Sequence, residues 1–141
     1  MAFDPELFLA RYAAAYNAHD PETLRSLFAL DDARFAVFED FSGTLFDGEG
    51  YGVVLEAVFD ATAEMSFEVL RCDTFGELAA VHAIQKIVDR DESGAIAEAL
   101  VRSTLLVSTA GREPRVVSAH FSLLPAADEA CCDPGACRGH E

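Results

Sequence analysis

Hydrophobic positions recur with the period of a helix in the first part of the chain. A first helix is predicted after Asp4, because Pro5 and Glu6 suit the first turn of a helix. A shorter second helix is predicted after the similar start at 20–22, and a third over residues 51–59. The apolar positions of the three helices are Phe8, Tyr12, Ala15 and Tyr16; Leu24, Leu27 and Phe28; and Tyr51, Val54, Leu55, Val58 and Phe59.

From Ser66 onward the period of the hydrophobic pattern changes to two, which is typical of strands. Turn residues divide this part into predicted strands at 67–74, 78–89, 96–108 and 115–123, after two short ones at 34–38 and 44–46. The short connections favour antiparallel neighbours. Helices followed by a run of strands predict an α+β domain over residues 1–124. Residues 126–141, after Pro125, have no apolar period.

Composition and charge narrow the classes of function. The chain has 141 residues, of which 51% are hydrophobic, and its net charge is −15, so it suits one folded domain. Ten Lys and Arg cannot supply the cationic face that a nucleic acid or an anionic membrane surface requires. No apolar run is long enough to span a membrane, and the acidic N-terminus is unlike a secretory signal. We therefore expect a cytoplasmic protein without nucleic-acid or membrane partners.

Three segments resemble the nuclear transport factor 2-like superfamily, and most closely its SnoaL-like and ketosteroid-isomerase-like branches. They are ARYAAAYNAHD at 10–20, LRSLFALDDA at 24–33 and RVVSAHFS at 115–122. The resemblance covers about residues 5–124. It implies a cone-shaped barrel, in which a curved antiparallel sheet wraps around N-terminal helices (the cystatin-like fold). It also implies an apolar pocket in the cone and a homodimer formed through the outer face of the sheet.

The chemistry of the ketosteroid-isomerase branch is only partly matched. Its first-helix tyrosine corresponds to Tyr12, but its general base falls at about Val37 and its second acid near Ser103. Glu39 and Asp40 follow the base position by two or three residues. Because two of the three catalytic groups are missing at the matching positions, steroid isomerisation is not expected.

The resemblance instead implies another polar set inside the cone. The proposed catalytic residues are Tyr12, Tyr16 and His82, with the histidine as general base or hydrogen-bonding anchor. The alternative is that these three side chains are ordinary packed residues. Alternation along 78–89 places Val81, Ala83, Gln85 and Ile87 on one face and His82, Ile84 and Lys86 on the other, and the resemblance turns the second set inward. The proposed ligand-binding residues are Phe8, Phe35, Ile84, Lys86, Val101, Ser103 and Phe121.

The acidic tail at 125–141 is not explained by the resemblance. Cys131, Cys132, Cys137 and His140 lie within ten residues and suit zinc or another thiophilic metal. The alternative is a disordered tail with thiols that oxidise. Within the fold no metal or cofactor is expected, and Cys72 is predicted to be a core residue.

Three functional hypotheses follow from the sequence. The leading one is a SnoaL-like protein that binds a small hydrophobic molecule in the cone, with an isomerase, cyclase or hydrolase activity left open. The second is a non-catalytic homodimeric association module. The third is binding of a soft metal or metalloid through the tail.

Overall fold

The computed structural model describes residues 2–39, 42–57, 63–90 and 93–124. Every helix and strand that the sequence predicts is present, with differences of a few residues at the ends. Val58, Phe59 and the tail at 125–141 lie outside the described residues. The elements are α1 Pro5–Asn17, α2 Pro21–Ser26, β1 Ala36–Glu39, β2 Thr44–Phe46, α3 Gly48–Ala57, β3 Glu64–Phe75, β4 Leu78–Arg90, β5 Ile96–Ser108 and β6 Arg115–Leu123.

The first two helices begin where their capping residues predict. The Asp4 carboxylate accepts a hydrogen bond from the Leu7 amide at 3.1 Å, and Asp20 accepts one from the Thr23 amide at the same distance. Each bond satisfies one amide that the first turn of a helix leaves without a partner. Between the helices His19 has φ 54°, a left-handed conformation that reverses the chain. The caps therefore fix where α1 and α2 begin, and the reversal at His19 places the two helices in a helical hairpin.

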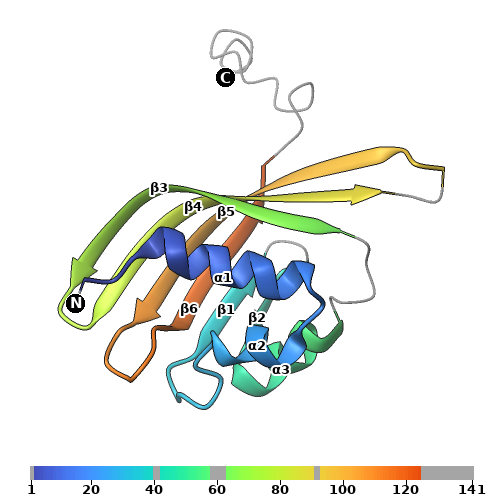
Figure 1. Cartoon of the computed structure of the whole chain (residues 1–141). Coiled ribbons are helices and arrows are strands. Elements are labelled where there is room, and N and C mark those ends of the chain that lie inside the picture. The colour runs from blue at the N-terminus through green and yellow to red at the C-terminus, as the bar shows by residue number, and fades with distance from the viewer. Residues whose placement is uncertain (1, 40–41, 58–62, 91–92, 125–141) are drawn as a thin grey trace, which may run out of the picture.

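The strands form one sheet in the order β2-β1-β6-β5-β4-β3 (Figure 1). Successive strands from β3 to β6 pair antiparallel, as their short connections predict. The predicted curved sheet is present, and it is mixed at one position, because β1 pairs parallel with β6. These two strands are far apart in the sequence, so no hairpin turn dictates their relative direction.

The sheet curves around α1, while α2 and α3 lie beside β1 and β2 (Figure 1). Register shifts between Val69 and Arg71 in β3 and between Leu106 and Val107 in β5 mark irregular positions of this sheet, and such bulges bend and twist a strand. The concave side holds the hydrophobic core, in which the largest fully buried side chains include Phe28, Leu9, Leu24, Leu27 and Leu105. Among the described residues, no helix is long and apolar enough to cross a membrane.

The Asn17 side chain ties the end of α1 to the start of β3. Its amide donates to the Met65 carbonyl oxygen at 3.0 Å, and its oxygen accepts from the Met65 amide at 2.7 Å. This pair of bonds satisfies both backbone groups of Met65 on the edge strand. It therefore holds the Met65 side chain toward the concave side.

Candidate functional site

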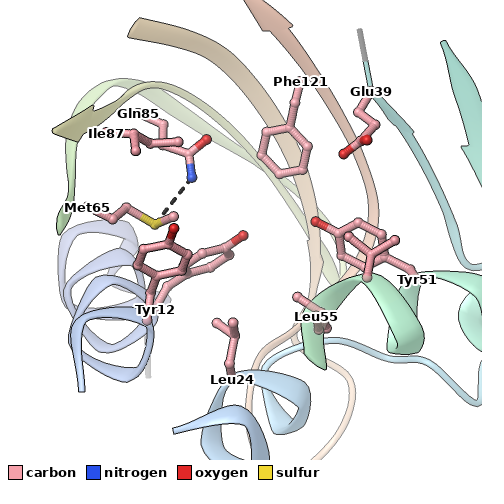
Figure 2. A pocket seen from close by; sticks show the side chains of 11 residues that line it. Tyr12, Leu24, Glu39, Tyr51, Leu55, Met65, Gln85, Ile87 and Phe121 are labelled. Carbon is pink, nitrogen blue, oxygen red and sulfur yellow. Dashed lines mark hydrogen bonds between the residues drawn. The ribbon is translucent and has the colours of Figure 1, made fainter. Parts of the chain in front are cut away.

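A cavity of about 250 Å³ opens on the concave side of the sheet, between the helices and the strands. Its wall is mostly apolar, and Figure 2 shows the side chains that point into it. The lining residues are Tyr12, Tyr16, Leu24, Glu39, Tyr51, Val54, Leu55, Met65, Gln85, Ile87 and Phe121. A mainly apolar pocket with a few polar groups is the usual form of a small-molecule site.

All three tyrosines of the chain line this cavity. Tyr12 and Tyr16 lie one turn apart on α1, and Tyr51 comes from the facing side of α3. Edge-to-face contacts hold the Tyr12 ring, with ring centroids 5.5 Å from Phe28 and 5.1 Å from Phe67. Such contacts stabilise aromatic pairs beyond the area that they bury. The Tyr12 hydroxyl is therefore carried on a ring with little freedom to move.

The hydroxyl-bearing side chains of Tyr12 and Tyr51 both line the cavity, and each affects the pKa of the other. Burial raises the pKa of Tyr12 well above its ordinary value, although the nearby Tyr51 hydroxyl opposes this shift. Burial also raises the pKa of Tyr51 and of Tyr16, and for Tyr16 the nearby Asp89 charge adds to the rise. The three phenols therefore stay protonated at neutral pH and can donate hydrogen bonds.

Glu39 brings a carboxylate to the same cavity. It is the last residue of β1, where alternation turns Val37 and Glu39 inward and Phe38 outward. Its negative charge contributes to the raised pKa of both Tyr12 and Tyr51. One of its oxygens accepts a hydrogen bond from the Ser42 hydroxyl at 3.0 Å. The resemblance places a general base at about Val37. Glu39 therefore provides a carboxyl group two residues later, on the same face of the strand.

Gln85 and Met65 form a second polar feature of the wall. The Gln85 side-chain nitrogen donates to the Met65 sulfur at 3.2 Å (Figure 2). Gln85 lies on β4 with 5% of its surface exposed, and it is one of two buried polar residues of the described chain. The hydrophobic alternation of its strand predicts the face on which Gln85 lies but indicates no role for it. The signal that could have found it is a polar side chain among Val81, Ala83 and Ile87.

The cavity includes only part of the predicted site. Tyr12, Tyr16 and Phe121 line it as expected. The expectation that His82, Ile84 and Lys86 point into the cone is wrong. The register pairs His82 with Thr104 and Ala83 with Ser103, so that Ala83 and the buried Ser103 share the concave face. The alternation was identified correctly, but the face carrying His82 lies outside, where water solvates its exposed polar groups.

The outward position of the second set is evident from its contacts. Lys86 forms an exposed ion pair with Glu98 at 3.4 Å. His82 is exposed beside Arg71, its partner on β3. General-base catalysis by His82 within the cavity is therefore excluded by its position on the outer face.

Four other predicted ligand-binding residues are buried without lining the cavity: Phe8, Phe35, Val101 and Ser103. They belong to the packed core, and the Ser103 hydroxyl donates to the Val101 carbonyl of its own strand at 3.4 Å. Cys72 is half-buried and packs against the core, as predicted.

Metal binding by Cys131, Cys132, Cys137 and His140 stays a prediction, because these residues lie outside the described part of the chain. Within residues 2–39, 42–57, 63–90 and 93–124, no three His, Cys, Asp or Glu side chains cluster as metal ligands would.

Comparison with known proteins finds similarity in structure alone. No family model matches the chain, and no curated protein matches its sequence. A candidate dehydratase of the nuclear transport factor 2-like family from Streptomyces avermitilis is 19% identical, with a TM-score of 0.70 over 85% of this chain and 94% of that chain. A nuclear transport factor 2-like protein with a cystatin-like fold from Novosphingobium aromaticivorans is 14% identical, with a TM-score of 0.70 over 91% and 86%.

A third similar structure is described as an association domain rather than an enzyme. It is a candidate association domain of calcium/calmodulin-dependent protein kinase II from Xanthomonas campestris, 15% identical, with a TM-score of 0.63 over 82% of each chain. At identities this low the likenesses establish the fold, and one fold serves many activities. The chain therefore has the nuclear transport factor 2-like fold, also named the cystatin-like fold.

Proposed function

We propose that the cone cavity binds a small, mainly apolar ketone or phenol and exchanges a proton with it through Glu39. The observation that carries this proposal is the meeting of one carboxylate with the Tyr12–Tyr51 hydroxyl pair in an apolar cavity. An engineered cavity of about 150 Å³ holds benzene, so one of about 250 Å³ suits roughly ten non-hydrogen atoms. A four-ring steroid is larger than this space.

The tyrosine pair supplies the hydrogen bond to the ligand oxygen. Burial raises the pKa of Tyr12 and keeps its hydroxyl group protonated, so that its proton is available to a ligand in the cavity. A ligand carbonyl that accepts this proton becomes polarised. A fixed donor in an apolar site stabilises negative charge on that oxygen more strongly than water does.

Glu39 supplies the base. The proton leaves the carbon beside the carbonyl group and moves to a Glu39 oxygen, while the electron pair of the broken C–H bond forms the carbon–carbon double bond of an enolate. Tyr12 stabilises the resulting oxyanion. Return of the proton to the same carbon or to a conjugated one completes an isomerase-type reaction without any co-reactant.

Isophorone, a cyclic enone of about ten non-hydrogen atoms, tests this proposal. Calorimetry gives its binding, and NMR in deuterium oxide gives the rate at which its ring protons exchange. We expect Glu39→Gln to keep binding and to lower the exchange rate by about 10²–10⁴-fold, as for loss of a general base. Tyr12→Phe should weaken both. Glu77→Gln, an exposed residue of the β3–β4 turn, is the matched control. Exchange that is equal in Glu39→Gln and the wild type would contradict the proposed role of Glu39.

Homodimeric association is a second candidate function, favoured by the outer face of the sheet. Phe38 is 47% exposed there, its ring stacks on His120 with centroids 5.7 Å apart, and the exposed Leu45 is its partner on β2. The association domain named above has the same fold.

Sedimentation at micromolar concentration tests this second candidate. If these residues form a dimer interface, Phe38→Glu should give a monomer, since a buried unpaired charge opposes association. Leu7→Glu, at an exposed apolar position on α1, is the control that should leave the dimer intact. A wild-type monomer would rule out the homodimer.

A further inference from the structure

We propose that Gln85 recognises a second polar group of the ligand, and that this group is a neutral carboxamide or lactam. This inference rests on the function proposed above and names the substrate class more closely. It assigns to Gln85 the role of a specificity-determining residue at the end of the cavity away from Glu39.

The hydrogen-bonding capacity of Gln85 is largely unused. A primary amide has two donor hydrogens and an oxygen with two lone pairs. Here the only partner of the side chain among the described residues is the Met65 sulfur, which is a weak acceptor. Exchanging the oxygen and nitrogen of the amide would not improve this. The amide oxygen would then face the Met65 sulfur, which has no hydrogen to donate.

Burial makes this unused capacity significant. An amide taken out of water without hydrogen bonds costs free energy, and Gln85 is 95% buried on the concave face. No side-chain oxygen or nitrogen sealed inside the described structure lacks a partner. The Gln85 oxygen has no hydrogen-bond partner among the described residues, so it is not one of these sealed atoms. It therefore faces the open space of the cavity rather than the packed wall. A ligand group placed there would complete its hydrogen bonds.

Gln85 and Glu39 lie on different sides of the cavity. Figure 2 shows Gln85, Met65 and Ile87 together on one side, and Glu39 and Tyr51 together on the other, with Phe121 between them. They are carried by β3 and β4 on one side and by β1 and α3 on the other. A ligand of about ten non-hydrogen atoms, such as a ring with polar groups at opposite ends, could therefore contact both sides.

Charge selects a neutral group over an anion. Glu39 is a carboxylate in the same small cavity, and the whole chain carries −15. A ligand carboxylate would be repelled by both. A carboxamide offers one donor and one acceptor side by side, which match the free oxygen and an N–H of Gln85 in two hydrogen bonds. A positively charged group would use only the oxygen.

Three probes that share a phenol end test this inference. The first, para-hydroxybenzamide, carries the amide; the second, para-isopropylphenol, replaces it with an apolar group of the same shape; the third, para-hydroxybenzoate, replaces it with an anion. Calorimetry measures the dissociation constant of each for the wild type and for Gln85→Leu. The decisive quantity is the affinity for the amide divided by the affinity for the isopropyl compound.

We expect Gln85→Leu to lower this ratio by at least about tenfold, the loss of two neutral hydrogen bonds. Ser103→Ala is the matched control: it removes a buried polar group of the neighbouring strand that does not line the cavity, and it should leave the ratio unchanged. Gln85→Met, which keeps an unbranched side chain, replaces the leucine variant if that variant fails to fold.

NMR of the wild type gives an independent measurement. The chain contains one glutamine and one asparagine, so its spectrum contains only two pairs of side-chain amide signals. The Gln85 pair should shift with para-hydroxybenzamide and stay in place with para-isopropylphenol. The Asn17 pair, held by Met65, is the internal control.

The possible outcomes separate this inference from the proposed function. An unchanged ratio in Gln85→Leu together with an unmoved Gln85 signal would overturn the role of Gln85, while binding of isophorone would leave the cavity as a ligand site. Tightest binding of para-hydroxybenzoate would overturn the preference for a neutral group. Failure of isophorone and of all three phenols to bind would overturn both proposals.

Discussion

At the residue scale, the tyrosines connect the packing of the core with the chemistry of the cavity. The chain has three tyrosines and no tryptophan, and all three tyrosines line the cavity. Ultraviolet absorbance and intrinsic fluorescence of this protein therefore report on the site itself. The same burial that fixes the rings also keeps their hydroxyl groups protonated.

Alkaline titration should show this effect. Because burial raises the pKa of all three phenols, their contribution to stability is present below the ordinary tyrosine pKa of about 10 and is lost as the pH rises further. We expect the phenolate absorbance to appear only above pH ~10, and to rise together with loss of the circular dichroism of the sheet. Phenolate that forms near pH 10 in a fully folded protein would contradict the burial of these groups.

At the element scale, close packing at the start of α3 places Tyr51. Gly48 begins this helix, and its backbone lies against the carbonyl group of Leu30. A Cβ atom at residue 48 would overlap that carbonyl oxygen. The glycine therefore lets α3 approach the loop after α2, three residues before Tyr51 enters the cavity.

Gly48→Ala should displace the start of α3. We expect the free energy of unfolding to fall by about 1–3 kcal/mol, the usual cost of forcing an extra carbon into a packed site. Denaturant unfolding measures this change, and tyrosine fluorescence measures the displacement of Tyr51. Gly111→Ala is the control, because its added carbon would make only ordinary contact with the Glu113 carbonyl oxygen at 3.8 Å. Equal stabilities of the two variants would show that the helix start tolerates a side chain.

The sequence of strand β4 predicts its two faces but not which of them points into the cavity. Its alternation correctly separated Val81, Ala83 and Gln85 from His82 and Lys86. The resemblance placed the face with His82 and Lys86 inward, whereas the structure has this face on the outside. A shift of one residue reverses every side chain of a strand, so the choice of face decided whether His82 or Gln85 enters the cavity.

At the scale of the whole molecule, the net charge of −15 affects stability as well as the choice of ligand. Like charges spread over a small fold repel one another and oppose the compact state. Six ion pairs between described residues are each at least partly exposed to water, so each of them offsets little of this repulsion.

Salt should therefore stabilise the protein. Raising the ionic strength from about 0.01 M to 0.15 M shortens the screening length from about 30 Å to 8 Å. We expect the melting temperature to rise over this range by a few degrees, because repulsion is screened more than the short ion pairs are. Thermal unfolding followed by circular dichroism measures the change, and a second monovalent salt at the same ionic strength is the control, because screening depends on ionic strength rather than on the identity of the salt. A melting temperature that stays constant or falls would show that repulsion is not important in this fold.

The sequence by itself determined the order of elements, because capping residues at Asp4 and Asp20 and the change of hydrophobic period are local signals. It also indicated Tyr12 and Tyr16, since both lie on the apolar side of one helix. These features depend on residues close together in the chain.

Only the tertiary structure decided which polar groups meet. Glu39, Tyr51 and Gln85 come from three different elements, and their meeting depends on the parallel pairing of β1 with β6 and on which face of β4 turns inward. Both depend on how the whole sheet curves around α1 (Figure 1). Contacts between distant segments produce no periodic pattern in the sequence. The composition of the cavity wall could therefore be determined only from the packed tertiary structure.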